Sequence, residues 1–260
     1  MATDDVIQGY ATTNDLAARR GLYEYTLEEP LTTYLLEYLR GFDGMKFCDV
    51  GCGYGSDAVA VQTRFPNAAV YGIDQSKGMI EAASKTDPRI HFSVSDASSL
   101  PIDTLFDRIL VKHVLHLVTN PKQAIEHIIS HLVPGGRAVF VLHSTQSQPK
   151  FTEWITWACR EFNVTYTSRT DDFAVENQHD LFNGEHRQIE VTSVTQHIEL
   201  TSAEPYVSYM STQKRWNRPL NADEMQRLLD RVRTDINTII AQQGKFTEVT
   251  NNGIVIVNRL

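Results

Sequence analysis

Short apolar segments and amphipathic segments alternate along the first half of the chain. Apolar runs bounded by turn residues are typical of buried strands, and apolar residues three and four positions apart are typical of helices that bury one face. Such alternation predicts βαβ crossovers, a parallel sheet and helices on both of its faces. The predicted strands are 46–50, 69–73, 90–94, 107–111 and 136–142, and the predicted helices between them are 57–64, 77–85 and 121–132.

The segment before the first strand has a helical pattern. The spacing of its apolar residues over 14–40 predicts a helix that ends at Gly41. Farther along, Pro134-Gly135-Gly136 predicts a tight turn ahead of the strand 136–142. The buried stripe of the helix is expected to consist of Leu31, Tyr34, Leu35 and Tyr38.

The pattern changes after residue 142. Residues 144–245 are expected to be mostly helical or irregular, and the turn sequence Asn251-Asn252-Gly253 predicts a β-hairpin close to the C-terminus. The whole is expected to be an α/β fold with a Rossmann-like seven-stranded sheet, an inserted helical lid, and helices on both faces. We expect one domain over 1–260, with an N-terminal helical cap 1–44, a ligand-binding core 45–143, a substrate lid 144–245 and a terminal hairpin 246–260.

Composition narrows the range of partners. The 260 residues include 24 Lys and Arg against 32 Asp and Glu, and the net charge of −8 disfavours capture of nucleic acid or anionic membranes. The apolar runs are too short to span a bilayer, and the polar, acidic N-terminus does not resemble a secretory signal. The odd number of cysteines makes a disulfide framework unexpected. We therefore expect a cytoplasmic monomer or homodimer that acts on a small molecule.

A glycine-rich loop follows the first predicted strand. In residues 49–55, DVGCGYG, the alternate glycines let the backbone turn sharply and approach a ligand closely. The spacing is GxGxG, not the GxGxxG of dinucleotide-binding folds, and Asp49 and Asp57 flank it. A pyrophosphate is disfavoured by acids at this helix N-terminus, whereas a ligand with a sulfonium and an ammonium is favoured by them.

Two further acids follow the next two predicted strands. A carboxylate at Asp74 can accept hydrogen bonds from ribose hydroxyls, as in other adenosine-binding α/β folds. Asp96, with the backbone of Ala97 beside it, suits the amino group and ring edge of adenine. Because the carboxyl ends of parallel strands meet at one edge, Asp49 is expected to lie in the same ligand site as these two acids.

In this order, the motifs CDVGCGYG, YGID, SDASSLP, FDRILVKHVLHLV and LVPGGRAVFVL resemble those of class I S-adenosylmethionine (SAM)-dependent methyltransferases, above all the broad UbiE-like group that modifies small molecules. The resemblance covers about residues 45–143 and the terminal hairpin. It implies the sheet order 3-2-1-4-5-7-6 with strand 7 antiparallel, SAM as cofactor and S-adenosylhomocysteine as product. The implied cofactor-binding residues are Asp49, Gly51, Cys52, Gly53, Asp74, Gln75, Met79, Asp96, Ala97, Ser98, Lys112 and Arg20.

Three histidines follow the fourth and fifth strands and are candidate catalytic residues. Methyl transfer is an in-line displacement at an activated carbon, so a general base matters only when the nucleophile arrives protonated. His116 resembles the general-base position of some O-methyltransferases, and a pocket wall or cofactor packing is the alternative interpretation. His113, in the same segment, and His143 are further candidates for a proton role.

Other site types are less well supported. Asn/Asp-Pro-Pro-Tyr, which amine methylators of nucleobases or glutamine tend to have, does not follow the fourth strand, and a Pro-Cys nucleophile does not occur. The loosely spaced His179-Asp180 and Glu185-His186 are more typical of a solvated loop than of a metal site, so no metal is expected.

The aromatic content of residues 144–245 favours a flat or apolar acceptor, although a packed lid core explains most of these residues equally well. The leading hypothesis is SAM-dependent methyl transfer to an O, N or C atom of a small metabolite of secondary metabolism. The alternative is a SAM-binding enzyme of the same fold that catalyses a rearrangement or cyclisation. The candidate substrate-binding residues are Tyr25, Trp154, Trp157, Tyr209 and Trp216.

Overall fold

The computed structural model describes residues 21–98, 100, 104–167, 173–177 and 179–260. The chain divides into two compact units, and each has its own hydrophobic core. Unit 1 draws on the ranges 1–29, 146–169 and 195–251, and unit 2 on 30–145, 170–194 and 252–260.

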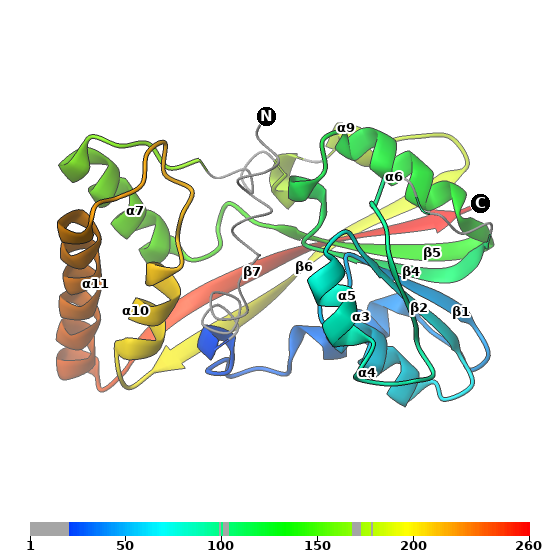
Figure 1. The fold of residues 1–260 in the computed structure, drawn as a ribbon, viewed down its shortest axis with the longest axis horizontal. Helices are drawn as coiled ribbons and strands as arrows, with labels where there is room; N and C mark the ends of the chain where they lie inside the picture. Colours follow the sequence, from blue (N-terminus) through cyan, green and yellow to red (C-terminus); the bar gives the residue numbers. More distant parts are fainter. Residues whose placement is uncertain (1–20, 99, 101–103, 168–172, 178) are drawn as a thin grey trace. The chain divides into compact units, whose positions relative to one another are not determined.

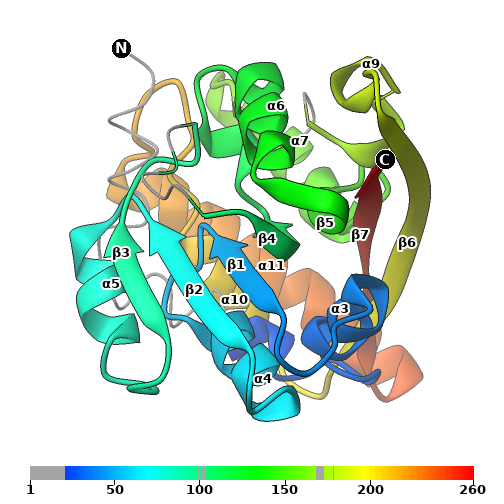
Figure 2. The same ribbon diagram turned by 90° about the vertical axis from the view of Figure 1, so that its right-hand side faces the viewer.

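The central sheet has seven strands in the order β3-β2-β1-β4-β5-β7-β6, as Figure 2 shows. The first five strands pair in parallel, and β7 is antiparallel to β5, which confirms the expected order and direction. The strands are β1 Lys46–Val50, β2 Ala69–Asp74, β3 His91–Val94, β4 Phe106–Lys112, β5 Leu132–His143, β6 Arg187–Leu200 and β7 Phe246–Arg259.

Helices cover both faces of the sheet in unit 2 (Figure 1). Along β4, Ile109 and Val111 belong to the core beneath α6, whereas Leu110 belongs to the core beneath α3 and α4. This alternation is the period of a strand that is buried on both sides. The helices of unit 2 are α3 Leu31–Leu39, α4 Ser56–Arg64, α5 Lys77–Ala83, α6 Pro121–Ser130 and α9 His179–Phe182, with 3-10 turns η1 Leu115–Leu117 and η2 Val175–Asn177.

The helix before β1 is shorter than predicted, because residues 24–30 are not helical and α3 begins only at Leu31. It also ends one residue earlier than predicted. Arg40, with φ of 46°, takes the left-handed conformation at the end of α3, so Gly41 is not the residue that reverses the chain. The absence of a side chain at Gly41 has a different cause. A Cβ there would lie 2.7 Å from the ring of Phe65.

The predicted turn at Pro134-Gly135-Gly136 lies inside β5. Phe106 of β4 pairs with Leu132, and Arg108 pairs with Arg137, so the intervening residues of β5 form a bulge. Gly135 has φ of 76°, the positive value that bulges often require of a glycine.

The predicted terminal hairpin is wrong, and the segment 144–245, expected to be mostly helical or irregular, also contains a long strand. β7 is one continuous strand that passes through Asn251-Asn252-Gly253 without reversing, and β6 lies within 144–245. Gly253 is needed for close approach and not for a turn, because a Cβ there would lie 2.2 Å from Cβ of Val175. The division into cap, core and lid otherwise stays a prediction.

Among the residues that the structure describes, the helices α7, α10 and α11 of unit 1 pack around a core of large side chains. In Figure 1, α11 lies beside α7 and α10, and the residues around Trp154 and Tyr206 are the centre of this core. A capping box between Asn221 and Glu224 begins the longest helix. Across both units, no helix within the described residues is long and apolar enough to cross a membrane. The helices of unit 1 are α7 Pro149–Phe162, α10 Glu204–Ser211 and α11 Ala222–Gln243.

Phe140 tests the packing of unit 2. Its side chain is fully buried in β5, and its ring lies 5.0 Å from that of Phe182. We expect Phe140→Ala to lower the free energy of unfolding by about 3–5 kcal/mol, because burial is lost and a cavity remains. The measurement is urea denaturation followed by circular dichroism. The control Val191→Ala, at a position 57% exposed, should change stability by less than about 0.5 kcal/mol. Equal losses in the two variants would contradict the assignment of Phe140 to the core.

Candidate active site

The glycine-rich loop is hydrogen-bonded to the end of the neighbouring strand. The N–H groups of Gly51 and Cys52 donate to the carbonyl oxygen of Ile73, at 2.8 and 2.9 Å. The side chain of Cys52 is buried, and its Sγ lies against Gly72, so the residue contributes to the loop through its backbone. Burial raises the pKa of this thiol, which therefore stays protonated near neutral pH.

The two glycines Gly51 and Gly53 both have positive φ, but only one of them also lacks room for a side chain. Gly51 has φ of 74°, and a Cβ there would lie 2.2 Å from Cγ2 of Val114. Gly53 has φ of 54°, and a Cβ there would meet nothing within 4 Å. The loop therefore packs tightly against Val114 at Gly51 and is open at Gly53.

Asp49 lies one residue before the end of β1 and is only 1% exposed. Its Oδ2 has no hydrogen-bond partner among the described residues. Burial raises the pKa of Asp49, and the nearby Asp57 and Asp74 raise it further, while Lys112 opposes the shift. A buried carboxylate with an unused oxygen is costly in the free protein, and a cationic ligand group would stabilise it.

The acid at the start of α4 is already neutralised. Asp57 forms an ion pair with Nζ of Lys112, and its Oδ1 accepts a hydrogen bond of 2.5 Å from the hydroxyl of Thr32. The sequence motifs identified both charged residues but not their pairing. Asp57 is therefore less available to a ligand cation than Asp49, and the side chain of Lys112 is engaged within the protein.

Asp74, the last residue of β2, holds the loop from the other side. Its Oδ2 accepts from the N–H of Gly53 at 3.0 Å, and its Oδ1 accepts from the N–H of Ser76 at 2.8 Å. Each oxygen keeps a lone pair, because a carboxylate offers about four acceptor positions. Of the other expected cofactor residues here, Gln75 is exposed, and Met79 is buried in α5.

Asp96 lies just beyond β3 and is exposed. Its Oδ1 accepts a 2.7 Å hydrogen bond from the N–H of Ser98 and a second bond from the hydroxyl of the same residue. Between them, Ala97 packs against the hydrophobic core of unit 2. The N–H of Ser95 donates to the carbonyl oxygen of Asp74 at 3.0 Å, which joins the ends of β2 and β3. The expected acids thus follow the carboxyl ends of neighbouring strands.

The three candidate catalytic histidines form one cluster after β4 and β5. The rings of His113 and His143 stack with centroids 4.5 Å apart, and the ring of His116 meets that of His143 edge-on at 5.5 Å. Burial lowers the pKa of His113 well below its usual value, and the other two histidines and Lys112 lower it further. His113 is therefore neutral at pH 7, the form in which an imidazole can accept a proton.

The remaining expected residues lie elsewhere. Arg20 is outside the described residues, and all five candidate substrate residues belong to unit 1. Trp154 is 1% exposed, and its Nε1 donates to Asp235 at 2.9 Å, so its surroundings are those of a core residue. Trp157 is half-buried beside Arg231, and Tyr25 is exposed. In unit 1, Tyr209 and Trp216 belong to a connected group of aromatic rings.

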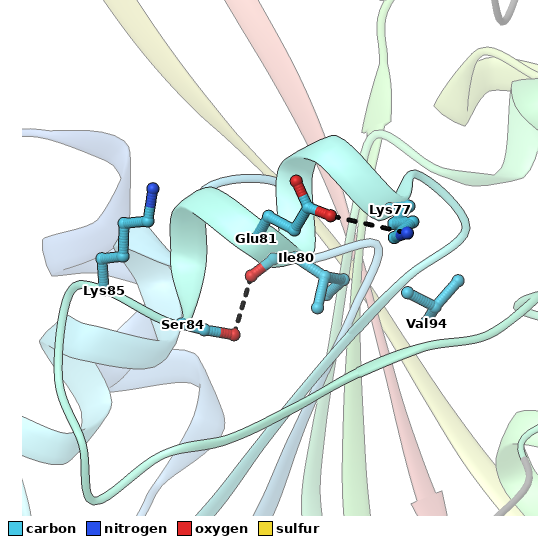
Figure 3. A pocket seen from close by; sticks show the side chains of 6 residues that line it. All are labelled: Lys77, Ile80, Glu81, Ser84, Lys85 and Val94. Atoms are coloured by element: carbon cyan, nitrogen blue, oxygen red, sulfur yellow. Dashed lines mark hydrogen bonds and ion pairs between the residues drawn. The ribbon is translucent and has the colours of Figure 1, made fainter.

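Two other kinds of site find no support. Among the residues that the structure describes, no cluster of three or more His, Cys, Asp and Glu side chains could hold a metal ion. A shallow hollow on α5 and β3, shown in Figure 3, does not include the acids or histidines described above. The Lys77–Glu81 ion pair of 3.7 Å crosses it. Its lining residues are Lys77, Ile80, Glu81, Ser84, Lys85 and Val94.

Comparison with known proteins identifies the family and the fold. A family model described as a methyltransferase domain matches residues 42–222. A trans-aconitate 2-methyltransferase of Variovorax paradoxus is 31% identical over 108 residues, 41% of this chain and 42% of that protein. A demethylmenaquinone methyltransferase of Clavibacter sepedonicus is 31% identical over 110 residues, 41% of this chain and 44% of that protein. The matches therefore span less than half the length of these relatives.

Among solved structures, the YcgJ protein of Bacillus subtilis has the same fold, with a TM-score of 0.60 and 15% identity, over 88% of this chain and 97% of that one. The sheet order is that of the class I SAM-dependent methyltransferase fold. The chain belongs to the methyltransferase-domain family, whose model matches more than half of its length.

A glycine substitution tests the tight packing of the loop. Gly51→Ala combines a positive φ with a clash against Val114, whereas Gly44→Ala, at φ of 83° with nothing within 4 Å, has only the first cost. We expect Gly44→Ala to destabilise by about 1–2 kcal/mol and Gly51→Ala by a further 1–3 kcal/mol or so. Urea denaturation measures both, and Val114→Ala should reduce the loss caused by Gly51→Ala. If the two glycine variants lose the same stability, the close approach at Gly51 is not a constraint.

Proposed function

We propose that this protein is a SAM-dependent methyltransferase that acts on a small, mostly apolar acceptor. The observation that carries the proposal is Asp49, a buried acid beside the glycine loop with one carboxylate oxygen unused. An ammonium group would supply the missing hydrogen-bond donor and the opposite charge. SAM, when bound, supplies a methyl group on a sulfonium and also has such an ammonium group.

The residues around Asp49 suit the rest of this ligand. The open backbone at Gly53 allows close approach, and the carboxylate of Asp74, oriented by two backbone N–H groups, has lone pairs for ribose hydroxyls. Asp96 and the adjacent backbone are proposed to bind the adenine edge, although this carboxylate is exposed and already accepts from Ser98. Lys112 contributes indirectly, because its ion pair with Asp57 leaves Asp49 as the acid without a partner for Oδ2.

A histidine of the cluster is proposed to act as the base where the nucleophile of the acceptor is protonated. The neutral state of His113 is the one that can take a proton. The two relatives named above act on small molecules according to their names, which supports a small acceptor but not its apolar character. Release of S-adenosylhomocysteine from SAM and an acceptor would distinguish methyl transfer from a rearrangement that leaves SAM unchanged.

Replacing Asp49 tests the cofactor site directly. We expect Asp49→Asn to weaken binding of SAM by roughly 10–100-fold, since one charge-assisted hydrogen bond of about 1.5–3 kcal/mol is lost. S-adenosylhomocysteine should lose the same factor, because it keeps the ammonium group and lacks only the sulfonium. Isothermal titration calorimetry measures both ligands. In the control Glu37→Gln, an exposed charge on α3 is removed, and the affinity should not change.

Two results would count against this site. If neither ligand binds the unaltered protein, the proposed function fails. If Asp49→Asn weakens only SAM, Asp49 acts on the sulfonium and not on the ammonium. The thermal stability of the free variant should be equal or higher at pH 7, because a buried charge has been removed.

The raised pKa of Asp49 predicts a pH dependence of binding. In the free protein, a folded pKa above the unfolded value means that the acid stabilises the fold while it is protonated, and that this stability is lost as the pH rises through the folded pKa. The free protein favours the protonated form of Asp49, whereas a bound ligand favours the ionised form, because its ammonium group is attracted to the carboxylate. Below the folded pKa the affinity for S-adenosylhomocysteine should therefore fall, by at most about tenfold per pH unit for one proton.

Calorimetry between pH 7 and pH 5 measures this effect, because an α-amino group stays protonated throughout that range. The Asp49→Asn variant should show a flat profile over the same interval. Parallel slopes in the two proteins would assign the titration to another group.

A further inference from the structure

Gln148, in unit 1, has a conformation and a polar atom that packing does not explain. It precedes α7 with φ of 53° and ψ of 61°, in the left-handed region that side chains other than glycine rarely adopt. The residue is 9% exposed, and its Nε2 is buried with no hydrogen-bond partner among the described residues. Most buried polar groups are paired, and backbone strain persists mainly at functional sites. The two features together therefore indicate a ligand.

The local structure does not require the carboxamide of Gln148. Its backbone N–H donates to the carbonyl oxygen of Val249 at 2.8 Å, which any residue other than proline could do. Its side chain makes no capping hydrogen bond to α7. Instead, Glu248 on β7 accepts from the N–H of Phe151 at 3.3 Å in the first turn of that helix. Because Glu248 contributes to the cap, the amide of Gln148 is available for another purpose.

An aromatic neighbour fixes the orientation of this amide. The hydroxyl of Tyr209 donates to Oε1 of Gln148 at 3.2 Å, so Nε2 keeps both of its N–H groups for a ligand. The ring of Tyr209 lies 5.9 Å from that of Phe151, which lies 6.1 Å from that of Tyr166. We call Gln148 with these three half-buried rings the aromatic amide site. It offers flat apolar surface and one neutral donor, the combination typical of small-molecule sites.

The surroundings of this site favour an uncharged ligand. The ring of Tyr206 lies 5.7 Å from that of Tyr209, and its hydroxyl donates to the buried Glu248 at 3.1 Å. Burial raises the pKa of Glu248, so these surroundings already disfavour one negative charge and would disfavour a ligand carboxylate for the same reason. A carbonyl oxygen can accept from a neutral amide without bringing a charge.

We propose that the aromatic amide site binds the methyl acceptor, a flat uncharged molecule whose carbonyl oxygen accepts a hydrogen bond from Nε2 of Gln148. The ring of this molecule would pack against Tyr209 and Phe151. The role as acceptor site rests on the proposed methyl transfer, whereas binding of the carbonyl compound does not depend on SAM.

The test compares three probes that share one ring system: 1-indanone, indane and indane-1-carboxylate. Titration of the full chain without SAM, followed by ligand-observed NMR, should show that 1-indanone binds more tightly than the other two. In Gln148→Met, which keeps the length of the side chain and removes the amide, binding of 1-indanone should weaken about tenfold or more, as for loss of a hydrogen bond to a buried group. Binding of indane should not change.

The matched control is Gln213→Met. This second buried amide is fully paired: Nε2 donates to the carbonyl oxygen of Tyr209 and to the hydroxyl of Thr212, and Oε1 accepts from Tyr166 at 2.8 Å. Its replacement should lower the Tm and leave the preference for 1-indanone over indane intact. Gln148→Met should leave the Tm unchanged or raise it, because an unpaired buried donor is removed.

Four results would overturn the inference. The first is that 1-indanone does not bind the unaltered protein at millimolar concentration, and the second is that Gln148→Met keeps the preference for 1-indanone over indane. The third is a lower Tm of Gln148→Met with unchanged binding of 1-indanone. The fourth is tighter binding of indane-1-carboxylate than of 1-indanone. Thermal stabilisation by S-adenosylhomocysteine is measured in both variants as well. This measurement tests the cofactor site of the proposed function independently of carbonyl binding. Absence of this stabilisation in the unaltered protein would count against the cofactor and not against carbonyl binding.

Discussion

The sheet of unit 2 is buried on both faces, and this constraint decides where a ligand can bind. Neighbouring residues such as Ile109 and Leu110 belong to cores on opposite sides, so these faces offer no place for a polar ligand. Polar side chains can meet a ligand only where the strands end, and parallel strands bring their carboxyl ends to one edge. Asp74 is the last residue of β2, and Asp96 lies just beyond the end of β3. Asp49 lies one residue inside β1, and this single step buries its carboxyl group.

The charges at this edge are unevenly matched. Of the two acids near the glycine loop, Asp57 takes the ion pair with Lys112 and the hydroxyl of Thr32, whereas Oδ2 of Asp49 has no partner among the described residues. Asp49 therefore lacks a positively charged partner of the kind that Lys112 provides for Asp57. A pyrophosphate would increase this imbalance, and an ammonium group would remove it, so the sign of the missing charge argues for the cofactor of this family more strongly than the glycines do. A glycine loop alone is shared with dinucleotide-binding folds.

The strands of unit 2 could be predicted because burial on both faces makes each a continuous apolar run, as in 107–111. β6 was missed because it alternates polar and apolar residues and lies in a segment with helices on either side. The Asn252-Gly253 pair was misinterpreted because a glycine needed for approach to Val175 has the same sequence signature as a hairpin turn. The site acids were found from their place after strands. The Asp57–Lys112 pair was not, since it joins residues far apart in the chain.

The proposed role of Gln148 illustrates why an acceptor site is harder to infer from sequence than a cofactor site. The acids proposed to bind the cofactor follow from the topology of a parallel sheet, which puts them at strand ends whatever the rest of the chain does. At Gln148, the contact with the start of α7 is made by another residue, Glu248 of β7. The side chain of Gln148 is therefore not needed there, and its amide accepts a hydrogen bond from Tyr209 instead. Sequence patterns record neither event, because a glutamine before a helix is an unremarkable residue. The signal is a buried nitrogen without a partner, which only the folded chain can reveal.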